Sequence, residues 1–285
     1  MSDRLILALD VGGSSVKSAV VSNDQHIVGR VSVDDIESGA DAPSILHTLA
    51  AIISAHRQKN SDIYRIAFAF PGPFDYEQGI SLLHHQAKYD ALYGRNIGTE
   101  LKEIIGLPIL EIRYRNDAEA AILGEALYGA GAVYSRLLGV TLGTGLGSAF
   151  IADRNLITEG ANIPSHGWLY PCMFGNQRAD DVFSTRGLLA RLREHGIHAT
   201  DIPSAMQDTD AHALAETFTS FGADLGTFLK PFVSEFHAQA VLVTGGIAEA
   251  WEHFSPSLIH TLPVPALKGA LGRRAALLGA AALYF

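Results

Sequence analysis

The stretch LALDVGGSSVKSAVV, residues Leu7–Val21, decides how the start of this chain folds. Two apolar runs flank a turn of Gly and Ser residues, which is the pattern of a β-hairpin. A hairpin does not require Asp10 at the end of its first strand, where a buried carboxylate is costly unless it has a partner. The stretch therefore predicts a hairpin whose turn holds a ligand.

The composition limits the classes of protein to consider. The chain has 285 residues, of which 48% are hydrophobic and 18% charged, so it is long enough for two lobes or one large domain with a substantial core. Its formal charge of -9 argues against a dedicated nucleic-acid binder but leaves room for a local basic pocket for phosphates. Cys172 is the only cysteine, which excludes an internal disulfide.

The location in the cell is predicted from the same data. The first strand is expected to start within about four residues of Met1, which leaves no room for a signal peptide or a DNA-binding segment ahead of it. No apolar run approaches the length of a transmembrane helix. We therefore expect a cytoplasmic protein whose partners include neither nucleic acid nor membrane.

The opening hairpin recurs later in the chain. SAVVSNDQHI from Ser18 aligns with SAFIADRNLI from Ser148, and each follows a strand and a glycine turn. Any two such hairpins look somewhat alike, but the recurrence also fits a duplicated lobe with two hairpins that grip one ligand. Other segments predict strands at 63–70, 109–114 and 240–243, and helices at 43–56, 97–105, 118–128, 182–195, 211–236 and from 273 onward. Alternating strands and helices predict an α/β protein with mixed sheets.

The first glycine turn is not one of the common nucleotide motifs. Gly12 and Gly13 lead into a strand rather than a helix, so neither a Rossmann fingerprint nor a Walker A loop fits. A hairpin turn can instead present backbone N–H groups to phosphate oxygens. Asp10 is placed to hold a hydrated Mg²⁺. Lys17 is either a phosphate contact or a solvated strand residue, and spacing alone leaves both open.

Two strand-to-helix junctions carry further candidate residues. Asn116 and Asp117 precede a helical run, where a helix N-cap is the simpler interpretation. The functional interpretation makes Asp117 a general base that takes the proton of an attacking hydroxyl, with Asn116 orienting the same substrate. The second junction, Thr244-Gly245-Gly246, suits a nucleotide near a helix terminus but is weak evidence alone.

The segment 162–186 is rich in polar and aromatic residues. Its His166, Asp180 and Asp181 match no zinc-site spacing, and the thiolates of such a site are lacking. Sugar hydroxyls are another natural partner for carboxylate and imidazole groups, although a lone loop histidine is more often structural.

In order along the chain, ALDVGGSSVK, FPGPFD, RNDAEAAILGEALYGAG, LGVTLGTGLGSAFI and VTGGI resemble the motifs of the ROK family of sugar kinases. The resemblance implies an α/β, two-lobed actin-like ATPase (ribonuclease H-like) fold with mixed sheets and an interlobe cleft. The lobes would be 1–117 and 118–285, with the last helix, about 273–285, packing back on the N-terminal lobe. It also implies a homodimeric carbohydrate kinase that moves the γ-phosphoryl group of Mg-ATP to a hexose or N-acyl hexosamine.

The family motifs assign roles by position. Asp117 becomes the general base, and Asp10 acts on Mg²⁺ through water. The sugar side would comprise Gly72, Asn116, Asp117, His166 and Asp180. The nucleotide side would comprise Asp10, Gly12, Gly13, Lys17, Gly143, Thr144, Gly145, Gly245 and Gly246.

The chain departs from the family in its sugar-binding and zinc segment. Many members carry Glu-x-Gly-His and a cysteine-rich zinc motif, whereas this chain reads Ile163-Pro164-Ser165-His166 and lacks the cysteines, so no zinc is expected. Asp180 is the best counterpart of the family's second sugar-binding Glu. A sensor that has lost turnover and a kinase that uses polyphosphate are the alternatives. The retained Asp10, Asp117 and glycine turns weigh against the sensor, and VTGGI with the acidic balance weighs against polyphosphate.

Overall fold

A computed structural model describes residues 5–85, 88–207 and 210–285. The chain divides into two compact units: unit 1 comprises Met1–Gly124 with Arg273–Phe285, and unit 2 comprises Glu125–Gly272. The division falls inside helix α3 (Asp117–Tyr128), seven residues after the expected position between 117 and 118. Residues 1–4, to which the expectation about a leader segment refers, lie outside the described part.

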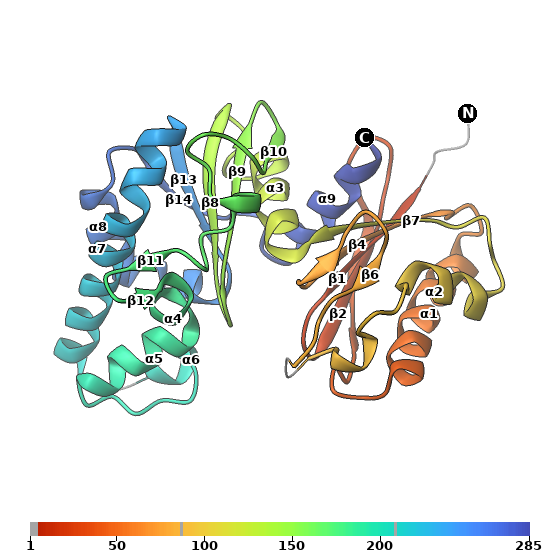
Figure 1. The fold of residues 1–285 in the computed structure, drawn as a ribbon, viewed down its shortest axis with the longest axis horizontal. Coiled ribbons are helices and arrows are strands. Elements are labelled where there is room, and N and C mark those ends of the chain that lie inside the picture. Colours follow the sequence, from red (N-terminus) through yellow and green to blue (C-terminus); the bar gives the residue numbers. More distant parts are fainter. Residues whose placement is uncertain (1–4, 86–87, 208–209) are drawn as a thin grey trace. The chain divides into compact units, whose positions relative to one another are not determined.

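Unit 1 is built on a five-stranded mixed sheet of order β3-β2-β1-β4-β7 (Figure 1). The predicted hairpin is confirmed, because β1 and β2 pair antiparallel with Asp10 opposite Lys17. β4 and β7 extend the sheet in parallel. The strands are β1 (Ile6–Val11), β2 (Ser15–Val21), β3 (Ile27–Asp35), β4 (Arg65–Phe70) and β7 (Glu111–Asn116), with a small separate pair, β5 (Phe74–Asp75) and β6 (Ile80–Ser81).

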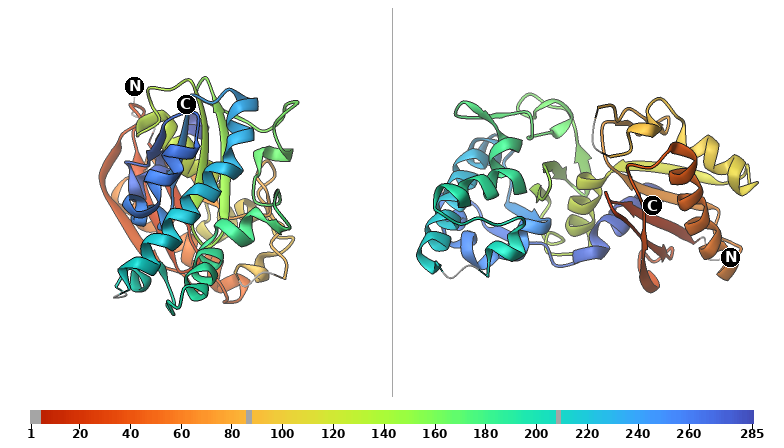
Figure 2. Two further views of the ribbon diagram at one scale, coloured as in Figure 1. Left: turned by 90° about the vertical axis from the view of Figure 1, so that its left-hand side faces the viewer. Right: turned by 90° about the horizontal axis from the view of Figure 1, so that it is seen from below.

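Different helices pack on the large and on the small side chains of this sheet. Leu7, Leu9 and Val11 form one core with α1 (Ala42–Lys59) and α2 (Ile97–Ile105). α9 (Ala275–Ala281), drawn in blue near the C-terminus in Figure 2, packs instead on β1 and β4. The small, buried Ala8, Ala67 and Ala69 on these strands leave room for its close approach. Arg115 fixes α9 further, since its Nη1 donates to the Gly279 carbonyl at 2.6 Å. The C-terminal segment is therefore part of unit 1.

Unit 2 repeats the sheet topology of unit 1, with order β10-β9-β8-β13-β14. β8 and β9 form an antiparallel hairpin, and β13 and β14 continue in parallel, as β4 and β7 do in unit 1. The recurrence of the hairpin sequence is thus matched by a recurrence of strand order. The strands are β8 (Arg136–Leu142), β9 (Leu146–Ala152), β10 (Asn155–Ile157), β13 (Ala240–Thr244) and β14 (Ala266–Lys268), and β11 (Met173–Phe174) pairs with β12 (Gln177–Arg178).

The helices of unit 2 pack on one face of its sheet and enclose the larger core. They are α4 (Ala179–Phe183), α5 (Thr185–Glu194), α6 (Ile202–Ala205), α7 (Ala211–Phe236) and α8 (Trp251–Thr261). The single helix expected over 182–195 is wrong, because the chain bends at Ser184, whose side chain accepts from the Gly187 N–H and starts α5. In the described ranges, no helix is long and apolar enough to cross a membrane.

Candidate active site

The turn between β1 and β2 is tied to a distant segment of unit 1. The Gly12 N–H donates to the Ser15 carbonyl at 2.9 Å, so this donor is used inside the turn rather than offered to a ligand. The hydroxyl of Tyr89 donates to the Gly12 carbonyl, and Ser38 Oγ donates to the Gly13 carbonyl. Of the two glycines expected to meet phosphate at this turn, Gly13 stays a candidate donor.

Asp10 and Lys17 form an ion pair across the hairpin. Lys17 Nζ lies 2.7 Å from Asp10 Oδ2, and the Asp10 side chain is 14% exposed. Neither interpretation of Lys17 from spacing included this pairing. A single carboxylate that is held in place and partly open suits Mg²⁺, which binds few protein oxygens and keeps waters and substrate phosphates.

Asp117 is the first residue of α3, directly after β7. The residue keeps partial access to solvent, while protein closely surrounds its carboxyl group. Burial raises the pKa of this carboxyl above the ordinary Asp range, and the Asp10 charge adds to the rise. The Ala118 N–H at 2.8 Å and the Lys88 charge oppose it. The result is a fixed carboxylate with raised proton affinity, as a general base requires.

Asn116 caps the helix that Asp117 begins. Its Oδ1 accepts from the N–H groups of Ala118 and Glu119 at 3.0 and 3.2 Å, and its Nδ2 donates to the Tyr76 hydroxyl at 3.0 Å. The N-cap interpretation is therefore confirmed for Asn116, and it fixes the base beside it. A Cβ on Gly72 would lie 3.0 Å from the Tyr76 hydroxyl and 3.5 Å from Asn116 Nδ2. Gly72 thus keeps the Asn116 amide uncovered.

In unit 2, the turn 143–147 is held by side chains from α4 and α5. The Gly143 carbonyl accepts from the N–H and Oγ1 of Thr185, at 2.7 and 2.9 Å. Asp180 Oδ1 accepts the Leu146 N–H at 2.7 Å, and Oδ2 lies 3.3 Å from an Arg186 nitrogen. Asp180, expected to bind sugar, thus shapes the second glycine turn.

The Thr244-Gly245-Gly246 junction lies against the same turn of unit 2. Gly245 has φ 97°, and a Cβ there would lie 2.4 Å from the Leu142 carbonyl oxygen, so no other residue fits. The glycines open a short 3-10 turn (Gly246–Ala250) before α8, instead of leading directly into an α-helix. The two glycine motifs of unit 2 are therefore neighbours through the parallel pairing of β8 with β13.

His166 is exposed and has φ 58°, with its ring centroid 4.6 Å from that of Trp168. Asp181 pairs with Arg186 at 2.6 Å. Within the described residues, no three His, Cys, Asp or Glu side chains come together as a metal site.

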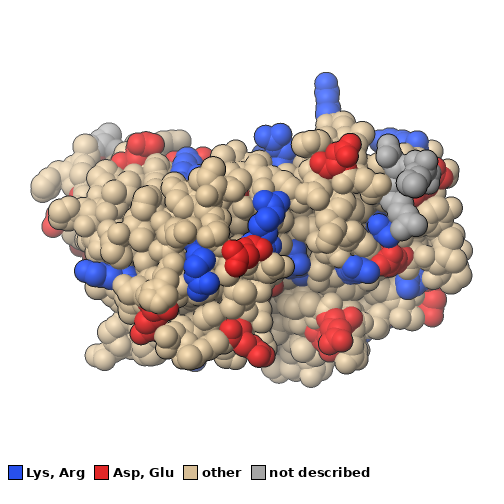
Figure 3. Space-filling view, turned by 90° about the horizontal axis from the view of Figure 1, so that it is seen from above, with Lys and Arg blue, Asp and Glu red and all other residues tan. Residues whose placement is uncertain are grey.

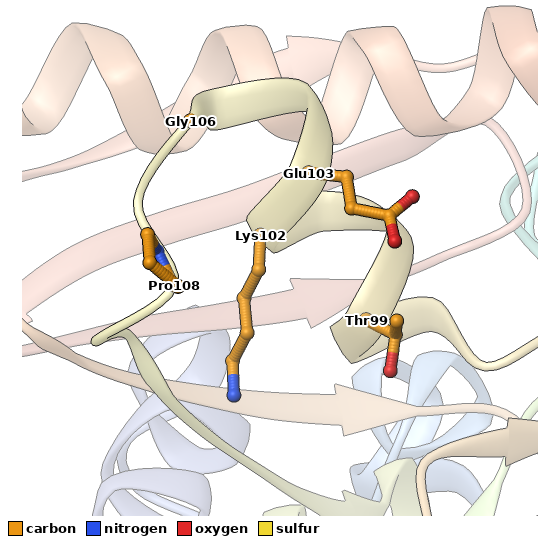
Figure 4. A pocket seen from close by; sticks show the side chains of 5 residues that line it. All are labelled: Thr99, Lys102, Glu103, Gly106 and Pro108. Atoms are coloured by element: carbon orange, nitrogen blue, oxygen red, sulfur yellow. The ribbon is translucent and has the colours of Figure 1, made fainter.

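Unit 1 also carries a surface hollow. Thr99, Lys102 and Glu103 line a hollow along α2 with Gly106 and Pro108, and none of these is a predicted site residue (Figure 4). On the face drawn in Figure 3, acidic and basic side chains are interspersed.

Sequence reasoning missed three residues beside the candidate base and the first turn: Tyr76, Lys88 and Tyr89. Tyr76 follows the FPGPFD motif directly and was within reach of motif reasoning. Lys88 and Tyr89 stand in a stretch without motif or periodicity, and Tyr89 meets a turn 77 residues away in sequence. Only the fold brings them to Gly12 and Gly13.

Comparisons with known proteins identify sugar kinases as relatives of this chain. A glucokinase from Halalkalibacterium halodurans is 26% identical over 88% of this chain and 82% of its own length. A beta-glucoside kinase from Listeria monocytogenes is 28% identical over 85% of this chain and 82% of its own. The crystal structure of a ROK family glucokinase from Streptomyces griseus, in complex with glucose and AMPPNP, matches with a TM-score of 0.76 at 20% identity over 98% of each chain. The α/β actin-like fold predicted from the sequence is confirmed. The ROK family profile matches residues 6–284, and this chain belongs to the ROK family.

Proposed function

We propose that this protein is an ATP-dependent sugar kinase that transfers the γ-phosphoryl group of Mg-ATP to a hydroxyl of a hexose or N-acyl hexosamine. Its enzyme class is that of a carbohydrate kinase, in line with the glucokinase and beta-glucoside kinase relatives. The observation that carries the proposal is Asp117, a desolvated carboxyl with a raised pKa, fixed at the start of α3.

Asp117 acts on the acceptor. Its carboxylate takes the proton of the sugar hydroxyl as the hydroxyl oxygen bonds to the γ-phosphorus. The bond from that phosphorus to the bridging oxygen breaks, and its electron pair leaves with ADP. Asn116 and Gly72 support binding of the same sugar, since Gly72 leaves the Asn116 amide accessible. The exposed His166 beside Trp168 is a further hydroxyl ligand in this proposal.

The glycine turns act on the nucleotide. Gly13 in unit 1, and Thr144 and Gly145 in unit 2, would meet phosphate oxygens through backbone N–H groups. Gly12 and Gly143 use their N–H groups inside the turns and would contribute by the absence of a side chain. Gly245 and Gly246 would leave space for the adenosine. Asp10, oriented by Lys17, would hold Mg²⁺, which neutralises phosphate charge when it is bound.

The experiment measures ADP release with Mg-ATP against a panel of hexoses and N-acyl hexosamines, and sugar-phosphate formation with polyphosphate as a second donor. We expect turnover with ATP on at least one sugar and none with polyphosphate alone. Binding of a sugar or ATP without turnover on any member of the panel would refute the kinase and favour a sensor.

A further inference from the structure

We propose that Lys88 is a catalytic residue, whose ammonium group binds the phosphoryl group while it passes from the nucleotide to the sugar. The inference rests on the proposed kinase function and adds to it a residue outside every motif of the sequence. Four observations in unit 1 carry it: the place of the side chain, the anchoring of its backbone, its lack of a carboxylate partner and the charges around it.

The Lys88 side chain lies across the first glycine turn. A Cβ built on Gly13 would lie 2.6 Å from both Cε and Nζ of Lys88, and 2.9 Å from its Cδ. The lysine thus occupies the space that the missing side chain of Gly13 leaves open. An ammonium group so close to the turn meets any phosphate that this turn receives.

The backbone beside Lys88 is fastened to the same turn. Tyr89 is fully buried, and its hydroxyl donates to the Gly12 carbonyl. The Tyr89 N–H donates to the Ser38 carbonyl at 2.7 Å, and Ser38 Oγ donates in turn to the Gly13 carbonyl. The backbone next to Lys88 is therefore connected to the turn in two ways, through the Tyr89 hydroxyl and through Ser38. The Lys88 side chain itself stays exposed.

The two lysines at this turn differ in their partners. Lys17 is paired with Asp10 at 2.7 Å. For Lys88, no carboxylate among residues 5–85, 88–207 and 210–285 lies within 4.0 Å of its ammonium nitrogen, although its charge acts on Asp117. Lys88 is thus a cation beside the candidate base and the phosphate turn, with its hydrogen-bond donors open to an anion.

The chemistry of the transfer needs such a cation. The phosphoryl group carries negative charge and must approach Asp117 and Asp10, which repel it. The hydroxyl oxygen bonds to phosphorus, its proton goes to Asp117, and the bond to the bridging oxygen breaks with its electron pair on ADP. Lys88 donates hydrogen bonds to non-bridging oxygens of the moving group and offsets the repulsion where it is greatest.

The test compares Lys88→Met and Lys88→Arg with Lys102→Met, a control at the hollow along α2. We expect Lys88→Met to lower kcat by about 10²-fold, as loss of one charge-stabilising donor does, with the sugar KM within threefold of wild type. Lys88→Arg should recover at least tenfold of that loss, and Lys102→Met should stay within twofold of wild type. A Lys88→Met enzyme with kcat within threefold of wild type overturns the proposal.

The pH profile separates contact with the phosphoryl group from an effect through Asp117. Removing the lysine charge shifts the acid limb of the rate profile to higher pH, because that charge lowers the pKa of Asp117. If Lys88 binds the phosphoryl group, the loss of rate persists on the alkaline plateau. Full recovery of kcat there would overturn the proposal.

A binding experiment keeps this inference separate from the kinase itself. If the wild-type protein phosphorylates no sugar, the proposed function fails, and the affinities for ATP and ADP are then measured by calorimetry in wild type and Lys88→Met. Contact with the terminal phosphate predicts that the preference for ATP over ADP falls at least fivefold in the variant. An unchanged ratio overturns the role of Lys88.

Discussion

The ammonium nitrogen of Lys17 lies 2.7 Å from Oδ2 of Asp10, so the two charged residues that flank the first glycine turn are partners of each other. From the sequence, Lys17 was a candidate phosphate contact, and Asp10 was a candidate to hold Mg²⁺. The pair unites these roles, because Lys17 orients the carboxylate and a bound cation must share that carboxylate with it. In the proposed function, Mg²⁺ binding at Asp10 is therefore coupled to this ion pair.

We expect Lys17→Met to lower the concentration of free Mg²⁺ that gives half-maximal turnover, because Asp10 then has no competing cation. Asp10→Asn should raise that concentration and lower kcat/KM for ATP by about 10²-fold, since a charged oxygen ligand is lost. Turnover measured over a Mg²⁺ titration checks both. Identical Mg²⁺ dependence in the two variants and wild type would refute the coupling.

The raised pKa of Asp117 predicts the pH dependence of the rate. Burial favours the protonated form, which cannot accept the hydroxyl proton, so kcat/KM should fall on the acid side with a midpoint above the ordinary Asp pKa of about 4. The measurement is kcat/KM from pH 4 to 9 at constant ionic strength. An acid limb at or below pH 4 would contradict the assignment.

The same pKa predicts a gain in stability when the base is removed. A carboxyl whose pKa is raised in the folded state contributes stability below its unfolded pKa, and this stability is lost as the pH rises through the folded pKa. Asp117→Asn stays neutral, so its Tm should exceed that of wild type at pH 7 and approach it near pH 4. Thermal unfolding at both pH values checks this, and a lower Tm for the variant at pH 7 would count against it.

A variant at Asp180 distinguishes a role in nucleotide binding from a role in sugar binding. Because its Oδ1 accepts the Leu146 N–H, Asp180→Ala, which removes this acceptor, should loosen the second glycine turn and raise the KM for ATP about fivefold or more, with the sugar KM within twofold. Asp181→Ala is the matched control, since Asp181 pairs with the same Arg186 and, within the described part of the chain, makes no hydrogen bond to the turn. A selective rise in the sugar KM would restore the sugar-binding role.

The contact of α3 with α9 predicts a strong effect on stability. A Cβ on Gly279 would lie 1.8 Å from the Ala120 carbonyl oxygen, so Gly279→Ala must push the two helices apart. Overpacking of this kind costs about 1–3 kcal/mol, which lowers Tm by roughly 5 °C in a domain of this size. Gly39→Ala, where the added Cβ meets nothing within 4 Å, should leave Tm unchanged. Equal Tm values for the two variants would show that the helices are not in contact.

Local patterns account for the parts of the fold that were predicted well. α2 has the bounds that its periodicity predicted, because Asn96 caps it and Gly106 ends it in the left-handed conformation. The prediction failed at one helix, where a local capping residue was overlooked. Ser184 divides the helix expected over 182–195 by starting α5 with its own hydroxyl.

In the candidate site, some residues could be named from local sequence, and others depend on contacts between distant segments. Asn116 and Asp117 could be named as candidates because the strand, the cap and the candidate base are consecutive in the sequence. Lys88 was not found, because its significance depends on the approach of residue 89 to Gly12 across the fold. Asp180 was named as a candidate sugar ligand from its residue type and position. Its partner, the Leu146 N–H, depends on how α4 packs beside β9.

In the proposed function, Asp117 serves as the base for phosphoryl transfer to a sugar. The most direct measurement is sugar-phosphate formation from γ-labelled ATP by wild type and Asp117→Asn, with sugar binding to both proteins measured alongside. We expect a labelled sugar phosphate with wild type and a loss of at least 10³-fold in the variant, whose sugar affinity stays within threefold. Label transfer by Asp117→Asn at a rate near that of wild type would contradict it.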